Sequence, residues 1–136
     1  MIDKEQMDKL YEEAQKIAHK AYAPYSKFRV GAALLCEDGT VITGVNVENR
    51  SFGLTVCAER NAVFTAVAKG YLRFSALAIS TPDSFEPVGP CGACRQVLGE
   101  FMTGNTPVRF AGSNQNQVNT TIGELLPFDS LHELKK

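Results

Sequence analysis

Three cysteines and one glutamate are the residues whose types and spacing in this sequence best suit chemistry. Glu59 lies two positions after Cys57, and the pair Cys91 and Cys94 begins 34 residues after Cys57. Cys91 and Cys94 are about one helical turn apart, so both sulfurs can point to one side. Each cysteine segment follows a loop and opens an expected helix, where free N–H groups stabilise a thiolate over a thiol. Zinc binds thiolates, so the spacing predicts one zinc ion per chain held by Cys57, Cys91 and Cys94.

Glu59 gives the expected zinc site a means of transferring protons. Three protein ligands leave the fourth corner of a zinc tetrahedron for water, which is typical of catalytic rather than structural zinc. Bound zinc lowers the pKa of water towards neutrality, and a nearby carboxylate that is not itself a ligand can carry protons to and from that water. The pattern therefore predicts a zinc hydrolase in which Glu59 is the general acid and base.

The charge of the expected site calls for a compensating cation. Three thiolates and one divalent ion sum to about −1, and a thiolate-rich set weakens zinc as a Lewis acid. Arg60 and Arg95 are each adjacent to the ligand segments and can offset this charge. We infer that Arg60 donates hydrogen bonds to ligand sulfurs and so withdraws electron density from the metal.

Two other interpretations of the cysteines use fewer of these residues. A Cys-x-x-Cys pair at a helix start is also typical of a redox dithiol, but this leaves Cys57 and Glu59 unexplained. A structural site with Cys36 as a fourth ligand would make the protein a zinc-stabilised binding module. Against that alternative, Cys36 ends an apolar segment, and an unpaired cysteine there is more simply a buried hydrophobic residue.

The first elements expected to position these groups are a helix and a hairpin. Apolar residues at three- and four-residue spacings predict an amphipathic helix that Pro24 ends; they are Met7, Leu10, Tyr11, Ala14, Ile17, Ala18 and Ala21. Asp3 and Gln6 form a plausible capping pair at its start. Residues 29–36 and 41–47 read as two strands joined by an Asp-Gly turn at 37–40.

The second half of the sequence alternates helices and strands. Helices are expected over 57–69 and 91–102, and strands over 76–80 and 107–111, with a weak strand after a polar turn at 113–116. The apolar face of the 57–69 helix is expected to comprise Ala58, Ala62, Val63, Ala66 and Val67. Thr121 and Glu124 resemble a capping box that opens a short last helix. A hairpin followed by alternating elements predicts an α/β protein with a mixed sheet covered by helices on both faces.

Composition limits the classes of protein that fit. The 136 residues, 44% of them hydrophobic, suit one domain over residues 1–136 that needs no disulfide. The net charge is −1 and no basic stripe is visible, which argues against a nucleic-acid partner. No apolar stretch reaches the roughly 18 residues of a membrane span, and the first residues lack a secretory pattern. We therefore expect a cytoplasmic protein, in which cysteines serve more often as metal ligands than in disulfides.

Several motifs along almost the whole chain resemble those of one enzyme family. They are Tyr22-Ala23-Pro24-Tyr25-Ser26-Lys27-Phe28, Val30-Gly31-Ala32-Ala33-Leu34, Asn46-Val47-Glu48-Asn49, Cys57-Ala58-Glu59-Arg60, Pro90-Cys91-Gly92-Ala93-Cys94-Arg95-Gln96 and Glu124-Leu125-Leu126-Pro127. Together they resemble the cytidine deaminases, in their small homotetrameric branch with three cysteine ligands. This resemblance implies a three-layer α/β/α sandwich with a mixed five-stranded sheet, zinc as cofactor, and hydrolytic deamination of cytidine or deoxycytidine in pyrimidine salvage.

The resemblance also implies roles for residues that no local pattern would single out. Glu59 would take a proton from water and deliver protons to the ring nitrogen and the departing ammonia. Phe28 matches the aromatic that packs on the pyrimidine, Asn46 and Glu48 match the pair that holds the ribose hydroxyl, and the Ala58 N–H matches the donor to the base carbonyl. The nearest rival substrate is another cytosine nucleoside, such as blasticidin S.

The chain departs from the family's pattern away from the metal and Glu59. Phe52 stands where the family often has tyrosine, so a hydroxyl that could reach the sugar in a neighbouring subunit is missing. Arg50 replaces a residue that is commonly small. Phe128 follows Pro127 directly, where the family has a short link of small residues before a phenylalanine. We treat Phe128 as a candidate substrate contact across the subunit interface.

Overall fold

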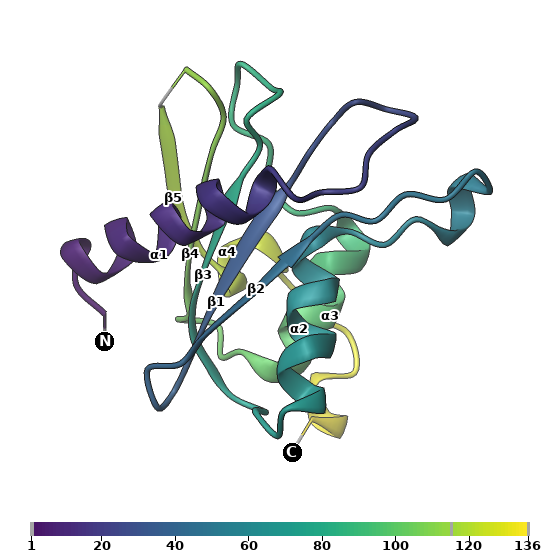
Figure 1. Cartoon of the computed structure of the whole chain (residues 1–136). Coiled ribbons are helices and arrows are strands. Elements are labelled where there is room, and N and C mark those ends of the chain that lie inside the picture. The colour runs from purple at the N-terminus through teal and green to yellow at the C-terminus, as the bar shows by residue number, and fades with distance from the viewer. Residues whose placement is uncertain (1, 115, 136) are drawn as a thin grey trace.

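A five-stranded mixed sheet forms the centre of the computed structural model, which describes residues 2–114 and 116–135 (Figure 1). The strand order is β2–β1–β3–β4–β5, and only β3 and β4 are parallel neighbours. The strands are β1 (Gly31–Cys36), β2 (Val41–Val45), β3 (Phe74–Ser80), β4 (Pro107–Ala111) and β5 (Gln117–Thr121). The mixed five-stranded sheet implied by the resemblance is therefore confirmed.

Helices cover both faces of this sheet. The helices are α1 (Lys4–Ala18), α2 (Ala58–Ala68), α3 (Gly92–Phe101) and α4 (Ile122–Leu125), with short 3₁₀ turns at Phe52–Leu54 and His132–Leu134. Alternate residues of β1 face opposite layers: Ala33 packs in a cluster with Leu10 of α1, whereas Ala32 and Leu34 pack in a cluster with Val63 of α2. The period-two alternation of a strand thus produces the predicted three-layer α/β/α arrangement.

Two glycines allow the helices to approach the sheet closely. A Cβ atom on Gly31 would lie 2.2 Å from the carbonyl oxygen of Ala14 in α1, and one on Gly44 would lie 2.4 Å from the amide nitrogen of Ala62 in α2. Any side chain at either position would push the helix off the sheet. The start of α2, which carries Cys57, is therefore set by backbone contact with β2.

Most predicted elements are confirmed, and the differences have identifiable causes. The Asp3–Gln6 capping box is present, and Thr121 caps α4 by accepting a hydrogen bond from the Glu124 amide. The first helix ends at Ala18 rather than at Pro24, because the chain turns there and Tyr22 pairs with Val47. No helix within residues 2–114 or 116–135 is long and apolar enough to cross a membrane.

The first strand also starts later than predicted, at Gly31 instead of Arg29. The amide of Arg29 donates to Asp83 Oδ2 at 2.9 Å and that of Val30 to Asn46 Oδ1 at 2.8 Å. Side-chain acceptors thus replace the partners that a neighbouring strand would supply. Val67, predicted to face inward, is 38% exposed on α2.

The ion pair between Arg29 and Asp83 fixes the loop after β3 to the start of β1. Arg29 Nη2 and Nε each donate to an oxygen of Asp83 at 2.8 Å. This pairing holds the pKa of Asp83 at about 2, below the usual value of about 3.9 for aspartate. The same loop continues to Cys91, eight residues after Asp83.

Asp83→Asn is expected to lower the free energy of unfolding by about 1 kcal/mol at neutral pH, because both partners keep some contact with solvent. A carboxyl whose pKa is depressed by folding stabilises the protein above its unfolded pKa and loses that contribution as pH falls to its folded pKa. Denaturant titrations should therefore show the full difference above about pH 5 and almost none near about pH 2. A difference that does not shrink in acid would contradict the ion pair as its source.

Candidate metal centre and active site

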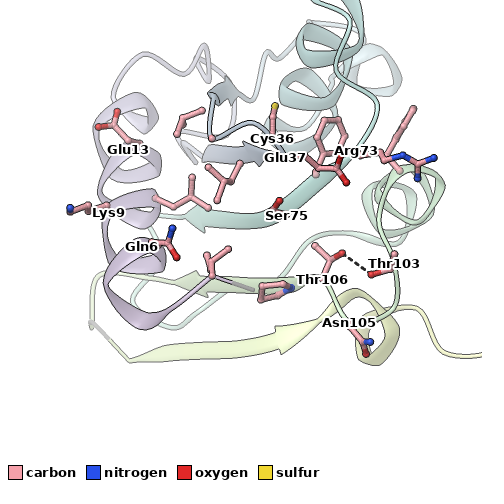
Figure 2. Close-up of a pocket in the computed structure, with 18 of the residues that line it drawn as sticks. Gln6, Lys9, Glu13, Cys36, Glu37, Arg73, Ser75, Thr103, Asn105 and Thr106 are labelled. Carbon is pink, nitrogen blue, oxygen red and sulfur yellow. Dashed lines mark hydrogen bonds between the residues drawn. The ribbon is translucent and has the colours of Figure 1, made fainter.

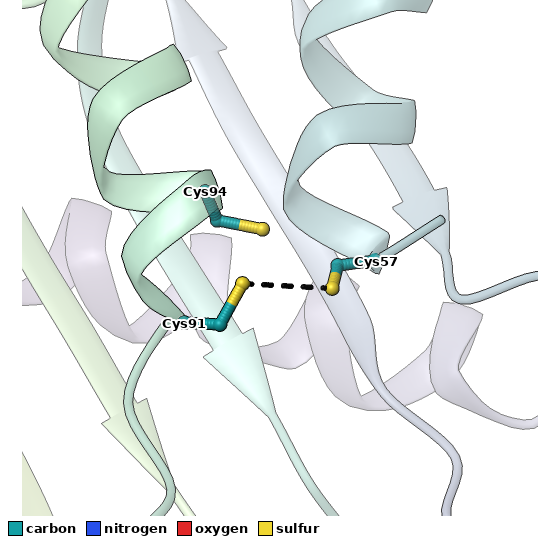
Figure 3. A group of neighbouring side chains, drawn as sticks. All are labelled: Cys57, Cys91 and Cys94. Atoms are coloured by element: carbon teal, nitrogen blue, oxygen red, sulfur yellow. Dashed lines mark hydrogen bonds between the residues drawn. The ribbon is translucent and has the colours of Figure 1, made fainter. Parts of the chain in front are cut away.

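The three predicted ligand cysteines meet where two helices begin. Cys57 is the N-cap residue of α2, Cys91 is the N-cap residue of α3, and Cys94 lies in the first turn of α3. Figure 3 shows their sulfurs turned towards one another across the space between the two helix starts. The N–H groups at both helix ends supply partial positive charge there, which favours thiolates.

The spacing of the sulfurs fits a zinc ion. The Sγ atoms of Cys57, Cys91 and Cys94 all lie within 4.8 Å of one another, and those of Cys57 and Cys91 are 3.8 Å apart. Tetrahedral zinc with bonds of about 2.3 Å separates two sulfurs by about 3.8 Å. Cys94 is buried, Cys57 half-buried and Cys91 exposed, so the cluster opens to solvent on one side. Three sulfurs and an open side suit a metal that also binds water.

The thiols of this cluster cannot all ionise without a cation. Hydrogen bonds from Cys94 and Arg60 lower the pKa of Cys57 to about 5. For Cys94, the interaction with Cys57 and burial of the thiol raise the pKa well above the usual range. One thiolate therefore suppresses the ionisation of its neighbour. A bound divalent ion neutralises the charge of both thiolates and so allows both thiols to ionise. Such a cluster therefore favours binding a metal.

Arg60 lies where the charge argument expected it, and Arg95 does not. Arg60 Nη2 donates to Cys57 Sγ at 3.4 Å. Arg95 instead donates from Nε to the carbonyl of Pro90 at 2.8 Å and from Nη1 to that of Leu125 at 3.1 Å. It thereby braces the residue before Cys91 against α4, a positioning role that no sequence pattern indicated.

Arg60→Gln is expected to raise the pKa of the Cys57 thiol in the zinc-free protein by about one unit, because a cation beside a thiolate favours its charged form. The pH dependence of thiolate absorbance near 240 nm measures this pKa, with Cys91 and Cys94 replaced by alanine so that one thiol of the site remains. In that background Cys57 has lost its Cys94 hydrogen bond, which isolates the effect of Arg60. An unchanged titration curve would contradict a charge-tuning role.

Glu59 is a buried carboxyl beside the sulfurs. It is 4% exposed and follows Ala58 in the first turn of α2. Burial raises the pKa of Glu59 to about 7. A carboxyl that exchanges its proton near neutral pH is suited to act as both base and acid.

The predicted substrate residues lie on two neighbouring segments that bind each other. The side-chain amide of Asn46 binds the backbone on both sides of Arg29. Its Nδ2 donates to the Phe28 carbonyl at 2.8 Å, and its Oδ1 accepts from the Val30 N–H at 2.8 Å. Glu48 Oε1 accepts from the amides of Tyr25 and Ser26 at 2.9 and 3.1 Å. The platform residue and the two sugar-binding candidates therefore form one hydrogen-bonded unit.

Phe52 and Phe128 lie on the surface of the single chain. Phe52 is 75% exposed and packs edge-on against Tyr25, with ring centroids 6.1 Å apart. Phe128 is fully exposed and has a positive φ of 54°. Neither side chain is buried by the fold of one chain.

Cys36 is remote from the cluster. It lines a hollow of about 1000 Å³ between the N-terminal part of α1, the end of β1 and the starts of β3 and β4 (Figure 2). Because α3 runs antiparallel to β3 and β4 as their crossover, the cysteines that begin α3 lie at the other end of these strands. Within the described residues, the sulfur group comprises Cys57, Cys91 and Cys94 without Cys36. A four-cysteine structural site is therefore not formed.

Comparison with known proteins agrees with this geometry. A family model described as the cytidine and deoxycytidylate deaminase zinc-binding region matches residues 4–109. A cytidine deaminase of Sporosarcina psychrophila is 50% identical over 121 residues, covering 89% of this chain and 88% of the relative. A blasticidin-S deaminase of Bacillus cereus is 35% identical over 111 residues, covering 75% and 76% of the two chains.

A solved structure extends the similarity to the fold. The crystal structure of cytidine deaminase from Burkholderia pseudomallei superposes with a TM-score of 0.85 at 46% identity, over 89% of this chain and 96% of that one. The family match includes the zinc-ligand motifs around Cys57 and Cys91, and the sulfurs converge as those motifs require. On this evidence the chain belongs to the zinc-binding cytidine and deoxycytidylate deaminase family.

Proposed function

We propose that this protein converts cytidine and deoxycytidine with water into uridine or deoxyuridine and ammonia. The observation that carries the proposal is the buried carboxyl of Glu59 beside three converging cysteine sulfurs. Water adds to the ring carbon that bears the amine, and the carbon–nitrogen bond to that amine then breaks. Two protons must reach nitrogen atoms during this exchange, so a group that both takes and gives protons is required.

Cys57, Cys91 and Cys94 would hold the zinc ion. When bound there, zinc supplies a Lewis acid that makes water nucleophilic at neutral pH. The two helix starts hold the three sulfurs in place before any ligand binds, and Arg60 reduces the negative charge at Cys57. The protein's part in this step is to keep one side of the sulfur cluster open.

Glu59 moves the protons. Its carboxylate takes a proton from the attacking water and gives it to the ring nitrogen. It then takes the proton of the newly added hydroxyl and passes it to the departing amine, so the carbonyl forms as the carbon–nitrogen bond breaks. A pKa of about 7 makes both directions accessible. Because Glu59 follows Cys57 on the same helix turn, its position relative to the sulfurs is fixed by α2.

The remaining site residues orient the nucleoside. The amide of Ala58 is in the first turn of α2, where N–H groups lack helical acceptors, and can donate to the base carbonyl. Phe28 offers an aromatic face for the pyrimidine. Asn46 keeps one N–H free, and Glu48 keeps an acceptor position free, which together suit a sugar hydroxyl that both accepts and donates.

We further propose a homotetramer. The outer side of α2 and the segment between α2 and β3 expose apolar side chains, namely Phe64 (52%), Val67 (38%) and Leu72 (59%). Exposed apolar groups that gather on one side of a helix favour association. In such an assembly Phe128 from a neighbouring copy would close the sugar side of the pocket. Residence in the cytoplasm and a role in pyrimidine salvage stay predictions from the sequence.

A direct assay tests the activity. Purified zinc-loaded protein should cause a loss of cytidine absorbance with release of one ammonia per uridine formed. Blasticidin S, measured in parallel, tests the related deaminase activity named by the Bacillus cereus relative. A zinc-loaded, folded protein that leaves every cytosine nucleoside unchanged would refute the proposal and favour a binding module.

A further inference from the structure

We propose that Ser26 is a positioning residue of the nucleoside site, because its hydroxyl joins the Glu48 carboxylate to the backbone of Phe28. This inference rests on the proposed function. Ser26 Oγ donates to Glu48 Oε2 and accepts from the Phe28 amide at 3.0 Å. One hydroxyl thus contacts both the carboxylate expected to bind the sugar and the residue whose ring is expected to pack on the pyrimidine.

The chemistry of the groups fixes the direction of these hydrogen bonds. An ionised carboxylate only accepts, so the single hydroxyl proton of Ser26 must point to Glu48. An amide N–H only donates, so the Phe28 amide must use a lone pair of the same oxygen. The orientation of the hydroxyl is therefore uniquely determined, and rotating it breaks one of the two contacts.

Ser26 also determines what Glu48 can offer a ligand. Oε1 already accepts from two amides, those of Tyr25 and Ser26, which occupies its two lone-pair directions. Among residues 2–114 and 116–135, Oε2 accepts from the Ser26 hydroxyl alone, so one acceptor position is left. Without that hydroxyl Oε2 loses the contact that sets its orientation. The position left for a sugar hydroxyl then becomes less well defined.

The loop itself does not depend on Ser26 alone. Tyr22 and the 46–48 segment exchange two backbone hydrogen bonds, from Tyr22 N to Asn46 O at 3.0 Å and from Glu48 N to Tyr22 O at 2.9 Å. The Asn46 amide independently holds the Phe28 carbonyl. Removal of the Ser26 hydroxyl should therefore leave the segment attached and the protein folded, with Glu48 Oε1 still held by two amides and Oε2 without its Ser26 contact.

Ser26→Ala in the zinc-loaded enzyme is expected to lower kcat/KM for cytidine by about 10- to 100-fold, mainly through KM, as loss of a hydrogen bond to a charged group predicts. 2′,3′-Dideoxycytidine lacks the 2′ and 3′ hydroxyls of the sugar, so its kcat/KM should fall much less. Ser26→Thr keeps a hydroxyl and should restore most of the preference for cytidine. Calorimetric binding of the product uridine should weaken in parallel, whereas binding of dideoxyuridine should change little.

Ser84→Ala is the matched control, because that loop serine donates to the Glu86 carbonyl and has no link to Glu48. If the alanine variant fails to fold, Ser26→Cys against Ser26→Thr makes the same comparison, since a thiol is a weak donor. Equal losses on cytidine and the dideoxy compound would overturn the positioning role. A wild-type protein inactive on both would instead refute the proposed function.

Discussion

Glu59→Gln is expected to lower kcat for cytidine by roughly 10³-fold or more, while zinc content stays near one per chain. Glutamine has almost the same shape as glutamate but cannot take a proton from water or deliver one to the ring and the amine. Burial raises the pKa of Glu59 to about 7, so the carboxyl is costly to ionise in place. The neutral amide should therefore not reduce the melting temperature. Absorbance assays, zinc analysis and thermal denaturation measure the three quantities.

Glu100→Gln provides the control for this experiment. Glu100 is an exposed glutamate on α3, remote from the turn that carries Cys94. Its replacement makes the same change from carboxyl to amide and should leave kcat unchanged. If the Glu59 variant keeps full activity with zinc bound, the proposal that Glu59 transfers protons is wrong. The proposed zinc ligands would not be affected by that result.

Cys94→Ala is expected to abolish tight zinc binding and reduce activity below detection. Cys94 is fully buried and contributes one of three sulfurs to the cluster, so two ligands from different helices would remain. Loss of a metal that binds only the folded chain also removes its contribution to stability, so the melting temperature should fall markedly. Zinc analysis after dialysis and calorimetric scanning with and without added zinc check both effects.

Cys36→Ala separates the catalytic site from a four-sulfur structural site. Cys36 is also buried, but it lines the hollow at the other end of the sheet. Its replacement should lower stability modestly, by about 1 kcal/mol for the small cavity created, and leave zinc content and kcat unchanged. Zinc lost from this variant, or retained by Cys94→Ala, would contradict the proposed ligand set.

The positioning of the site depends on long-range contacts that local patterns do not reveal. Ser26 contacts Glu48, 22 positions away, and Arg29 pairs with Asp83, 54 positions away. Neither contact follows from periodicity. A serine in a loop and a charged residue beside a strand are common in proteins, and neither indicates a particular partner. Arg95 seemed suited to offset thiolate charge, but its guanidinium is occupied by two carbonyl groups.

The sequence alone was sufficient to predict most of the elements and the three cysteines that form the cluster. Helix caps, the Asp-Gly turn and apolar periodicity are local, so the Asp3 cap, the hairpin and the helix starts at Cys57 and Cys91 could be read from neighbouring residues. The Cys-x-Glu and Cys-x-x-Cys spacings are short for the same reason. Zinc chemistry then followed from residue type.

Only the tertiary structure decided which groups meet. Gly31 and Gly44 let two helices rest on the sheet backbone, and the α3 crossover brings Cys91 and Cys94 back beside Cys57. Side-chain acceptors at Asn46 and Asp83 moved the start of the first strand by satisfying amides that the sequence pattern assigned to a strand ladder. A buried amide N–H can donate to any acceptor with suitable geometry, whether backbone or side chain. That geometry exists only once distant segments have packed together.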